Sequence, residues 1–316
     1  MALEELVTEL KTVWKFDYEP SIKALRDLYE TAKKEQWNAA TDIHWDQEID
    51  KDGDILDPEQ DPFRSFDFVK ALPEDKQKEL AVRRAAWTLS QFLHGEQGAL
   101  LCCGQLVEAV PDMDGKLYAS TQVIDEARHV EVFHRYVQRL DRVYPIDPAL
   151  QTVLNAILEA DMWQMKCVGM QVIVESLAMG SFKIMKKGTR DPLLKSIVEL
   201  TAQDEARHVS YGLIYMKDEI PKLSEPDRDR LEDFAWTAVD IMAGQGRRMS
   251  SQAELYAGLG IDTKAAMEEL RERFRDPKRR ANRPNAFRQY VIPQLQRIDL
   301  ITERTAPNYR KLGFEV

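Results

Sequence analysis

Hydrophobic residues recur every three to four positions along most of the chain, and this spacing predicts α-helices. No alternation of Val, Thr and Tyr is long enough to predict a β-sheet. An irregular acidic loop is expected at 40–65 and an irregular tail at 305–316. No linker divides the helices, so we predict one all-α domain over residues 1–316. The expected helices span 20–35, 74–109, 114–141, 148–187, 191–220, 225–256, 263–276 and 284–304.

Two of these helices carry the same motif, "DEARH", at residues 125–129 and 204–208. Residues three apart lie on one face of a helix, so Glu126 projects beside His129 and Glu205 beside His208. A Glu-x-x-His pair on each of two helices is half of a carboxylate-bridged two-metal site in a four-helix bundle. The other half needs one glutamate from each of two further helices.

Glu96 and Glu175 supply the missing half of this pattern. Each lies 30 residues before a motif glutamate, and the two halves of the chain are offset by 79 residues throughout. This indicates an internal duplication of a helix pair. The sequence therefore predicts a metal-binding bundle over about 74–220.

Apolar neighbours predict that Glu96 and Glu175 are buried, where an unpaired carboxylate costs several kcal/mol. Two divalent cations would cancel the four glutamate charges and leave two neutral imidazoles as ligands. Carboxylate oxygens with imidazole nitrogens suit iron or manganese, whereas zinc usually takes fewer ligands in a tetrahedral site. The structural-only alternative is that a surface helix carries Glu-x-x-His by chance.

Composition narrows the function classes further. The formal charge of -10 and the pI near 5.2 argue against non-specific nucleic-acid binding, although a basic patch near 275–284 stays open. The most apolar stretch, 167–182, is too short for a membrane span and contains Glu175. Three cysteines without a CxxC motif predict a reduced, cytoplasmic protein. The acidic stretch "DKDGDILDPEQ" lacks the glycine and glutamate of a calcium loop.

The ligand helices "FLHGEQGALL", "DEARHVEVF", "VIVESLAMG" and "DEARHVSYG" resemble, in order, those of the ferritin-like di-metal carboxylate superfamily. Within it, the chain is most similar to the ribonucleotide reductase small-subunit-like oxidases, which include ligand-binding oxidases and related di-iron oxygenases. The resemblance implies a ferritin-like four-helix bundle with additional N- and C-terminal helices. It covers about residues 25–220 well and the C-terminal third loosely.

The resemblance also implies a ligand set. One metal ion would be held by Glu96, Glu126 and His129, and the other by Glu175, Glu205 and His208, with two glutamates bridging. It implies a pair of iron ions as the preferred metal content and a manganese–iron pair (Mn/Fe) as the alternative to this Fe/Fe pair, with O2 as co-substrate. It also implies an external electron donor and a homodimer.

Around these ligands, Asp125 and Asp204 resemble the acids that accept the ring N–H of the ligand histidine from the opposite helix pair. Arg128 and Arg207 would neutralise those acids, or else form solvated salt bridges. Trp37 resembles the head of an electron path in the reductase subunits, and the alternative is an ordinary core tryptophan.

Departures from the family patterns limit the activity that can be carried over. Phe133 stands where most reductase small subunits have their radical tyrosine, and Glu96 stands where they commonly have Asp. Met170 and Ala99 replace the Tyr–Val pair that the ligand-binding oxidases cross-link. Thr201 replaces a third histidine of the arylamine N-oxygenases.

We therefore predict an O2-dependent oxidase or oxygenase that acts on a small apolar or amphipathic molecule by hydroxylation, desaturation or N-oxygenation. The alternatives are a radical-generating subunit that docks through its tail, with Tyr309 and Phe314, and a non-enzymatic metal- or lipid-binding protein. The remaining histidines, His44, His94 and His134, are expected to be structural or exposed. The predicted substrate-pocket residues are Ala99, Phe133, Met170, Ala178 and Met179.

Overall fold

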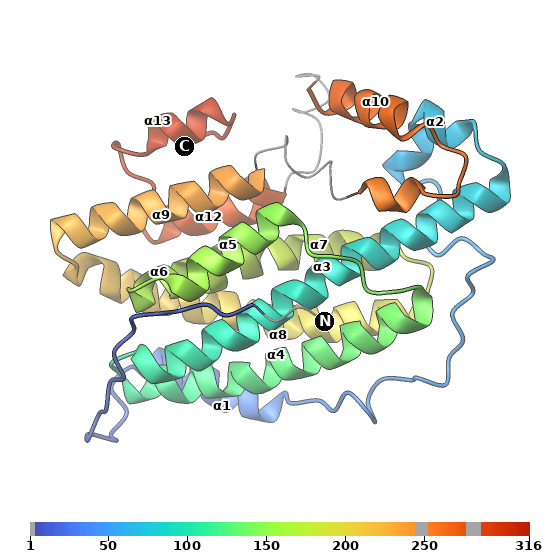
Figure 1. The fold of residues 1–316 in the computed structure, drawn as a ribbon. Helices are drawn as coiled ribbons and strands as arrows, with labels where there is room; N and C mark the ends of the chain where they lie inside the picture. The colour runs from blue at the N-terminus through green and yellow to red at the C-terminus, as the bar shows by residue number, and fades with distance from the viewer. Residues whose placement is uncertain (1–3, 244–251, 276–285) are drawn as a thin grey trace.

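The computed structural model describes residues 4–243, 252–275 and 286–316, and the bundle at its centre is built from four long helical segments. Helices α3 (Glu74–Ala109) and α4 (Met113–Leu140) form an antiparallel pair (Figure 1). The π-helical turn η2 (Val168–Val174) leads directly into α7 (Glu175–Gly188), which packs against α8 (Pro192–Glu219). The predicted all-α, ferritin-like bundle is confirmed, and no strand occurs in the described residues.

Local sequence signals start several of these helices. Asp147 and Asp191 each precede a proline, and their carboxylates accept hydrogen bonds from the backbone N–H groups at the starts of α5 (Pro148–Glu159) and α8. Proline suits the first helical position because its missing N–H would have no partner there. Helix α3 begins after Pro73, with Glu74 and Asp75 in its first turn, where acidic groups favour the positive end of the helix dipole.

The predicted helix at 148–187 is wrong as a continuous element. Helix α5 ends at Glu159, and the chain restarts as α6 (Trp163–Cys167) before η2 and α7. At this break the buried Lys166 donates hydrogen bonds through Nζ to the carbonyl oxygens of Ile157 (3.1 Å) and Leu158 (2.7 Å). A cation at these last carbonyls satisfies groups that have no partner within the helix.

Differences from prediction also occur near the C-terminus. The predicted helix 225–256 is wrong at its end, because α9 is described over Glu225–Ala243 and a 3-10 turn occupies Ala253–Tyr256. Helix α10 (Thr263–Arg275) agrees with the predicted 263–276 over the residues that are described. The predicted helix 284–304 is described from residue 286, and it ends at Arg297 after η5 (Phe287–Val291) and α12 (Ile292–Arg297). The predicted irregular tail contains α13 (Ala306–Lys311). The basic stretch at 276–285 lies outside the described residues.

The outer elements cover the bundle. Helix α1 (Lys23–Lys34) packs on α4 and α8, while α5 and α9 cover the opposite side (Figure 1). The loop 40–65 contains a short 3-10 turn, Pro62–Ser65, and precedes α2 (Asp67–Lys70). By length and composition, one helical stretch in the described ranges, Trp163–Gly188, could cross a membrane, but 67% of its apolar window is buried inside the protein. A core position of the bundle explains its apolar character.

Candidate metal centre

The structure brings the six sequence-predicted ligands together in the centre of the bundle. All six side chains are almost completely buried. Their oxygen and nitrogen atoms form two overlapping groups, in each of which the ligand atoms lie within 4.8 Å of one another. Glu126 and Glu205 belong to both groups, so they are the geometric candidates for bridging carboxylates. The groups are Glu96, Glu126, His129 and Glu205, and Glu126, Glu175, Glu205 and His208.

The two histidines face the carboxylates in the same way. Nδ1 of His129 lies 3.2 Å from Glu96 and 3.3 Å from Glu126, and Nδ1 of His208 lies 2.8 Å from Glu205. Nε2 of His129 donates to Asp204 Oδ2 (3.0 Å), and Nε2 of His208 donates to Asp125 Oδ2 (3.2 Å). Each aspartate thus holds the histidine of the opposite helix pair and turns its Nδ1 toward the glutamates.

Two arginines and a tryptophan support these aspartates. Arg128 and Arg207 are 8% and 5% exposed, so their ion pairs with Asp125 and Asp204 are buried rather than solvated. Trp37 is a core residue whose Nε1 donates to Asp204 Oδ2 at 2.7 Å. This network links the two clustered histidines to the segment that follows α1.

Burial and neighbouring negative charges raise the pKa of two of the clustered glutamates. Burial, followed by repulsion from Glu205, raises the pKa of Glu96 and of Glu175 well above the usual value. Burial alone would lower the pKa of His208, but Glu126 and Glu205 raise it to about 10. In the metal-free protein, protons take up the excess negative charge. A donor set of this charge fits two divalent cations, which would replace those protons.

The π-helical turn η2 contributes directly to this geometry, because it ends at the residue before Glu175. π-turns inside α-helices are rare and frequently lie at functional sites. Its seven residues are all buried. The wider turn of the π-helix rotates α7 about its axis relative to α6. The spacing of an α-helix that starts at residue 148 would therefore not predict the direction in which the Glu175 side chain points.

Sequence reasoning missed two buried amides beside the ligands. Gln122 and Gln171 each lie one helical turn before a predicted ligand, Glu126 and Glu175. Nε2 of Gln122 donates to Glu126 Oε1 (2.9 Å) and to Gln171 Oε1 (2.8 Å). Their i−4 spacing from the glutamates is the signal that could have identified them. Sequence reasoning also missed Gln36, which lies just after α1 and donates to Asp125 (2.9 Å). No signal in the sequence predicts this contact.

The predicted pocket residues divide between two hydrophobic clusters. Ala99 and Met170 belong to one hydrophobic cluster, whereas Phe133 and Ala178 belong to the other. Met179 is half-buried. The second cluster contains three packed rings, since Phe182 lies 4.8 Å from Phe92 and 5.7 Å from Phe133 between ring centroids.

The other histidines lie apart from the ligand groups. His44 and His134 are exposed, and Nε2 of His94 hydrogen-bonds to the Tyr144 carbonyl oxygen (2.9 Å).

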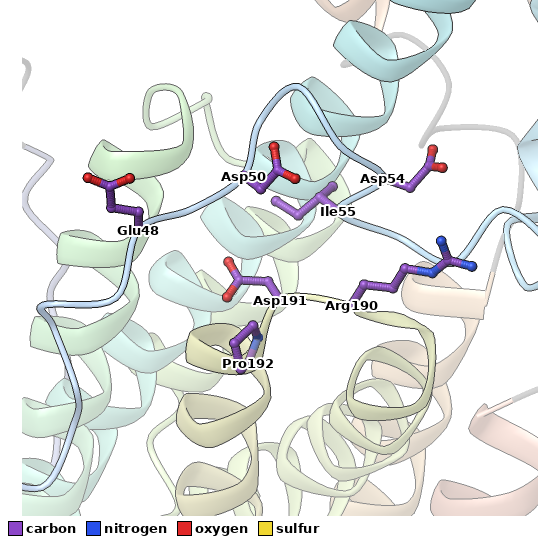
Figure 2. A pocket seen from close by; sticks show the side chains of 7 residues that line it. All are labelled: Glu48, Asp50, Asp54, Ile55, Arg190, Asp191 and Pro192. Carbon is purple, nitrogen blue, oxygen red and sulfur yellow. The ribbon is translucent and has the colours of Figure 1, made fainter.

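A surface pocket of about 260 Å³ lies near the N-terminus of α8 (Figure 2). Asp191, which lines it, precedes Glu205 by 14 residues, or about 21 Å along the helix. The pocket is therefore remote from the clustered glutamates and histidines of the candidate metal centre. Its lining residues are Glu48, Asp50, Asp54, Ile55, Arg190, Asp191 and Pro192.

Comparison with known families identifies the chain. A profile of the family described as "P-aminobenzoate N-oxygenase AurF" matches residues 20–292, which is most of the sequence. The chain belongs to the AurF family. The match covers every element of the bundle, and with it all six clustered glutamates and histidines.

Relatives of this AurF family member are distant. It is 20% identical over 221 residues to "Uncharacterized protein Mb0909" of Mycobacterium bovis and to "Uncharacterized protein MT0908" of Mycobacterium tuberculosis. The alignment covers 66% of this chain and 64% of each relative's own length.

Among solved structures, the R2-like ligand-binding oxidase from Sulfolobus acidocaldarius is similar at 17% identity and a TM-score of 0.50, over 89% of this chain and 91% of that one. This likeness supports the fold. An "R2-like ligand-binding oxidase with aerobically reconstituted Mn/Fe cofactor (long soak)" aligns at 20% identity and a TM-score of 0.42, over 79% of this chain and 90% of that one.

Proposed function

We propose that this protein is an O2-activating dinuclear metal enzyme that oxidises a small apolar or amphipathic organic molecule. The single observation that carries the proposal is the buried cluster of four glutamates and two histidines, in which both ring N–H groups are held by aspartates. Hydroxylation, desaturation and N-oxygenation are the reactions considered. The family description makes N-oxygenation of an aromatic amine the first to test.

The residues fit two metal ions. Glu96 and His129 would hold one ion, Glu175 and His208 the other, and Glu126 and Glu205 would bridge them. An iron pair, or a manganese–iron pair, would supply the electrons that reduce O2. We propose Fe/Fe as the resident pair, with Mn/Fe as the alternative, because both suit carboxylate and imidazole ligands.

The chain's own side chains would prepare this site. Asp125 and Asp204 hold the imidazoles in one orientation, so that Nδ1 of each ring would face a metal ion and give up its proton when that ion binds. Burial would raise the pKa of Asp204, but the hydrogen bond and charge of His129, followed by the charges of His208 and Arg207, lower it to about 2. Arg128 and Arg207 add buried ion pairs to the same aspartate.

The packed rings on one side of the cluster support an apolar substrate. Phe92, Phe133 and Phe182 pack against one another as hydrocarbon rings, and Ala178 packs against the same cluster. Side chains of this kind predominate in the pockets that bind organic ligands. We propose that this side, with Phe133 and Ala178, receives the substrate, while Ala99 and Met170 line the opposite side. Met179 is the remaining candidate beside Glu175.

The radical-subunit alternative is less well supported. It requires a free C-terminal tail, but Tyr309 and Phe314 are 0% and 4% exposed. Tyr309 packs edge-on against Trp236, with ring centroids 5.0 Å apart. The tail is therefore already docked on its own chain. We further propose a cytoplasmic homodimer that receives electrons from an external donor.

Oxygen uptake tests the proposed function. Metal-free protein would be loaded without oxygen with iron(II), manganese(II) or both, then exposed to O2 beside a Glu126→Ala/Glu205→Ala variant. We expect O2 uptake in the wild type and none in the variant, followed by faster uptake with a panel of aromatic amines or fatty acids. Equal O2 uptake by both proteins would refute the proposed enzyme. A preference for small charged metabolites would refute the proposed substrate class. Metal binding without catalytic uptake would favour the non-enzymatic alternative.

A further inference from the structure

The two sides of the glutamate cluster have diverged within the duplicated helix pair. The residues four positions before and seven positions after each of the four clustered glutamates form two layers, one on each side of the cluster. A residue and its counterpart 79 positions later in the repeat always lie in opposite layers. One layer is aromatic, with three phenylalanines and a threonine. The other holds two amides, a thiol and a glycine. The pairs across the repeat are Phe92 with Gln171, Gln122 with Thr201, Cys103 with Phe182, and Phe133 with Gly212.

Gln122 is the centre of the polar layer. It is completely buried, and its Nε2 has three acceptors within 3.5 Å, although an amide nitrogen carries only two hydrogens. The two shorter contacts reach Glu126 Oε1 and Gln171 Oε1, and the third, at 3.5 Å, reaches Glu175 Oε1. Gln122 therefore lies against two carboxylates of one ligand group.

Gln171 fixes the orientation of Gln122. Its Oε1 accepts from Gln122, while its own Nε2 donates to the Cys103 sulfur at 3.5 Å. Gly212 leaves room for it, because a Cβ there would lie 2.6 Å from the Gln171 Cβ. The result is one hydrogen-bonded row from the Cys103 sulfur through both amides to Glu126.

The repeat-related layer has no equivalent of this row. Thr201 occupies the position that corresponds to Gln122, and its hydroxyl has no hydrogen-bond partner within the described part of the chain. Phe92 occupies the position that corresponds to Gln171. Among the described residues, the hydrogen bond that reaches the Glu96 carboxylate comes from His129. The two halves of the candidate site thus differ in the donors that hold their carboxylates.

We propose that Gln122 is a positioning residue that makes the two metal positions unequal, by holding Glu126 and Glu175 in place for the ion on the His208 side. The inference rests on the proposed function, since it needs a dinuclear site. A hydrogen bond to an ionised carboxylate is stronger than one between neutral groups, and it fixes the direction of the remaining lone pairs. Loss of such a partner typically costs 10–100-fold in metal affinity.

Manganese(II) titration without oxygen tests the inference, with calorimetry to count ions and electron paramagnetic resonance to separate single ions from coupled pairs. We expect wild-type protein to bind two ions as a coupled pair. In Gln122→Leu, we expect the first affinity to be retained and the second to fall about 10–100-fold. At two equivalents the variant would then show the signal of isolated manganese.

Thr201→Val is the matched control, because it alters the repeat-related position but removes a hydroxyl without a partner; both affinities should stay unchanged. Gln171→Leu frees one anchor of Gln122 and should weaken the second ion less than Gln122→Leu does, which provides a test if the latter fails to fold. Unchanged affinities in folded Gln122→Leu, or equal loss at both positions, would overturn the inference. Fewer than two ions in the wild type, with manganese(II) and with iron(II) alike, would refute the proposed function itself.

Discussion

At the scale of single residues, Asp125 and Asp204 each accept a hydrogen bond from Nε2 of one clustered histidine, and Asp204 also accepts from Trp37. The sequence predicted the glutamate–histidine pairs of this cluster, because helical spacing places a glutamate beside a histidine three positions later. The buried surroundings of Glu96 and Glu175 were also predictable, since their neighbours are apolar. The partners of Gln122 were not, because an amide contact between α4 and η2 depends on how two distant segments pack. The same holds for Trp37, whose hydrogen bond to Asp204 spans 167 positions.

Asp204→Asn tests whether the aspartates orient the ligand histidines. The change replaces a carboxylate that accepts from His129 and Trp37 and pairs with Arg207. We expect metal affinity to fall about 10–100-fold, because a neutral amide holds the imidazole less firmly. Calorimetric titration with manganese(II) measures this. Asp161→Asn, which removes an exposed ion pair with Arg230, should leave the affinity unaltered; equal affinities in all three proteins would argue against the orienting role.

At the scale of elements, most helices were predictable because their periodicity and starting residues agree. The break between α5 and α6 was not, since the apolar pattern continues through it. Lys166 lies at this break with a fully buried side chain, and its Nζ donates to Gln105 (2.9 Å) as well as to two carbonyls of α5. A lysine in an apolar helix face gave no indication that it would cap a neighbouring helix.

Stability should depend on pH through Lys166. Burial lowers its pKa from 10.5 to about 8, so between these values the folded protein binds fewer protons than the unfolded chain. The free energy of unfolding should therefore rise as pH increases from 8 toward 10.5. Urea unfolding at pH 7 and 9.5 measures this, with Lys166→Met for comparison. The free energy of unfolding of the variant should increase less between these two pH values. The same pH dependence in both proteins would contradict the lowered pKa of Lys166.

The contact between α8 and η2 should be sensitive to one added methyl group. A Cβ on Gly212 would lie 2.6 Å from the Gln171 Cβ, so Gly212→Ala should cost about 1–3 kcal/mol by overpacking. Gly104→Ala is the control, because nothing lies within 4 Å of its added Cβ and alanine favours a helix by up to about 1 kcal/mol. Thermal unfolding compares them. Equal stability changes in the two variants would show that the close approach at Gly212 is absent.

At the scale of the whole molecule, the four-helix architecture followed from the repeat, whereas the placement of the C-terminal helices did not. Helix α13 was predicted as an irregular tail because six residues are too few for a periodic signal. The structure buries its Tyr309 completely. Tertiary burial, rather than local propensity, therefore determines this last helix.

Metal binding should stabilise the entire fold, because the ions replace the protons that now offset four buried carboxylates. An ion at about 100 times its Kd adds ~2.7 kcal/mol to the free energy of unfolding. Differential scanning calorimetry with and without manganese(II) should show a higher Tm in its presence. The Glu126→Ala/Glu205→Ala variant should show no such increase; an equal increase in both proteins would indicate binding elsewhere.

The central claim is that two metal ions lie among these six side chains. Anomalous X-ray diffraction from crystals loaded with iron(II) or manganese(II) under anaerobic conditions tests it most directly. The account predicts two anomalous peaks, one beside Glu96 and His129 and the other beside Glu175 and His208, with Glu126 and Glu205 between them. A single peak, or peaks only at surface carboxylates such as those of the pocket in Figure 2, would contradict it.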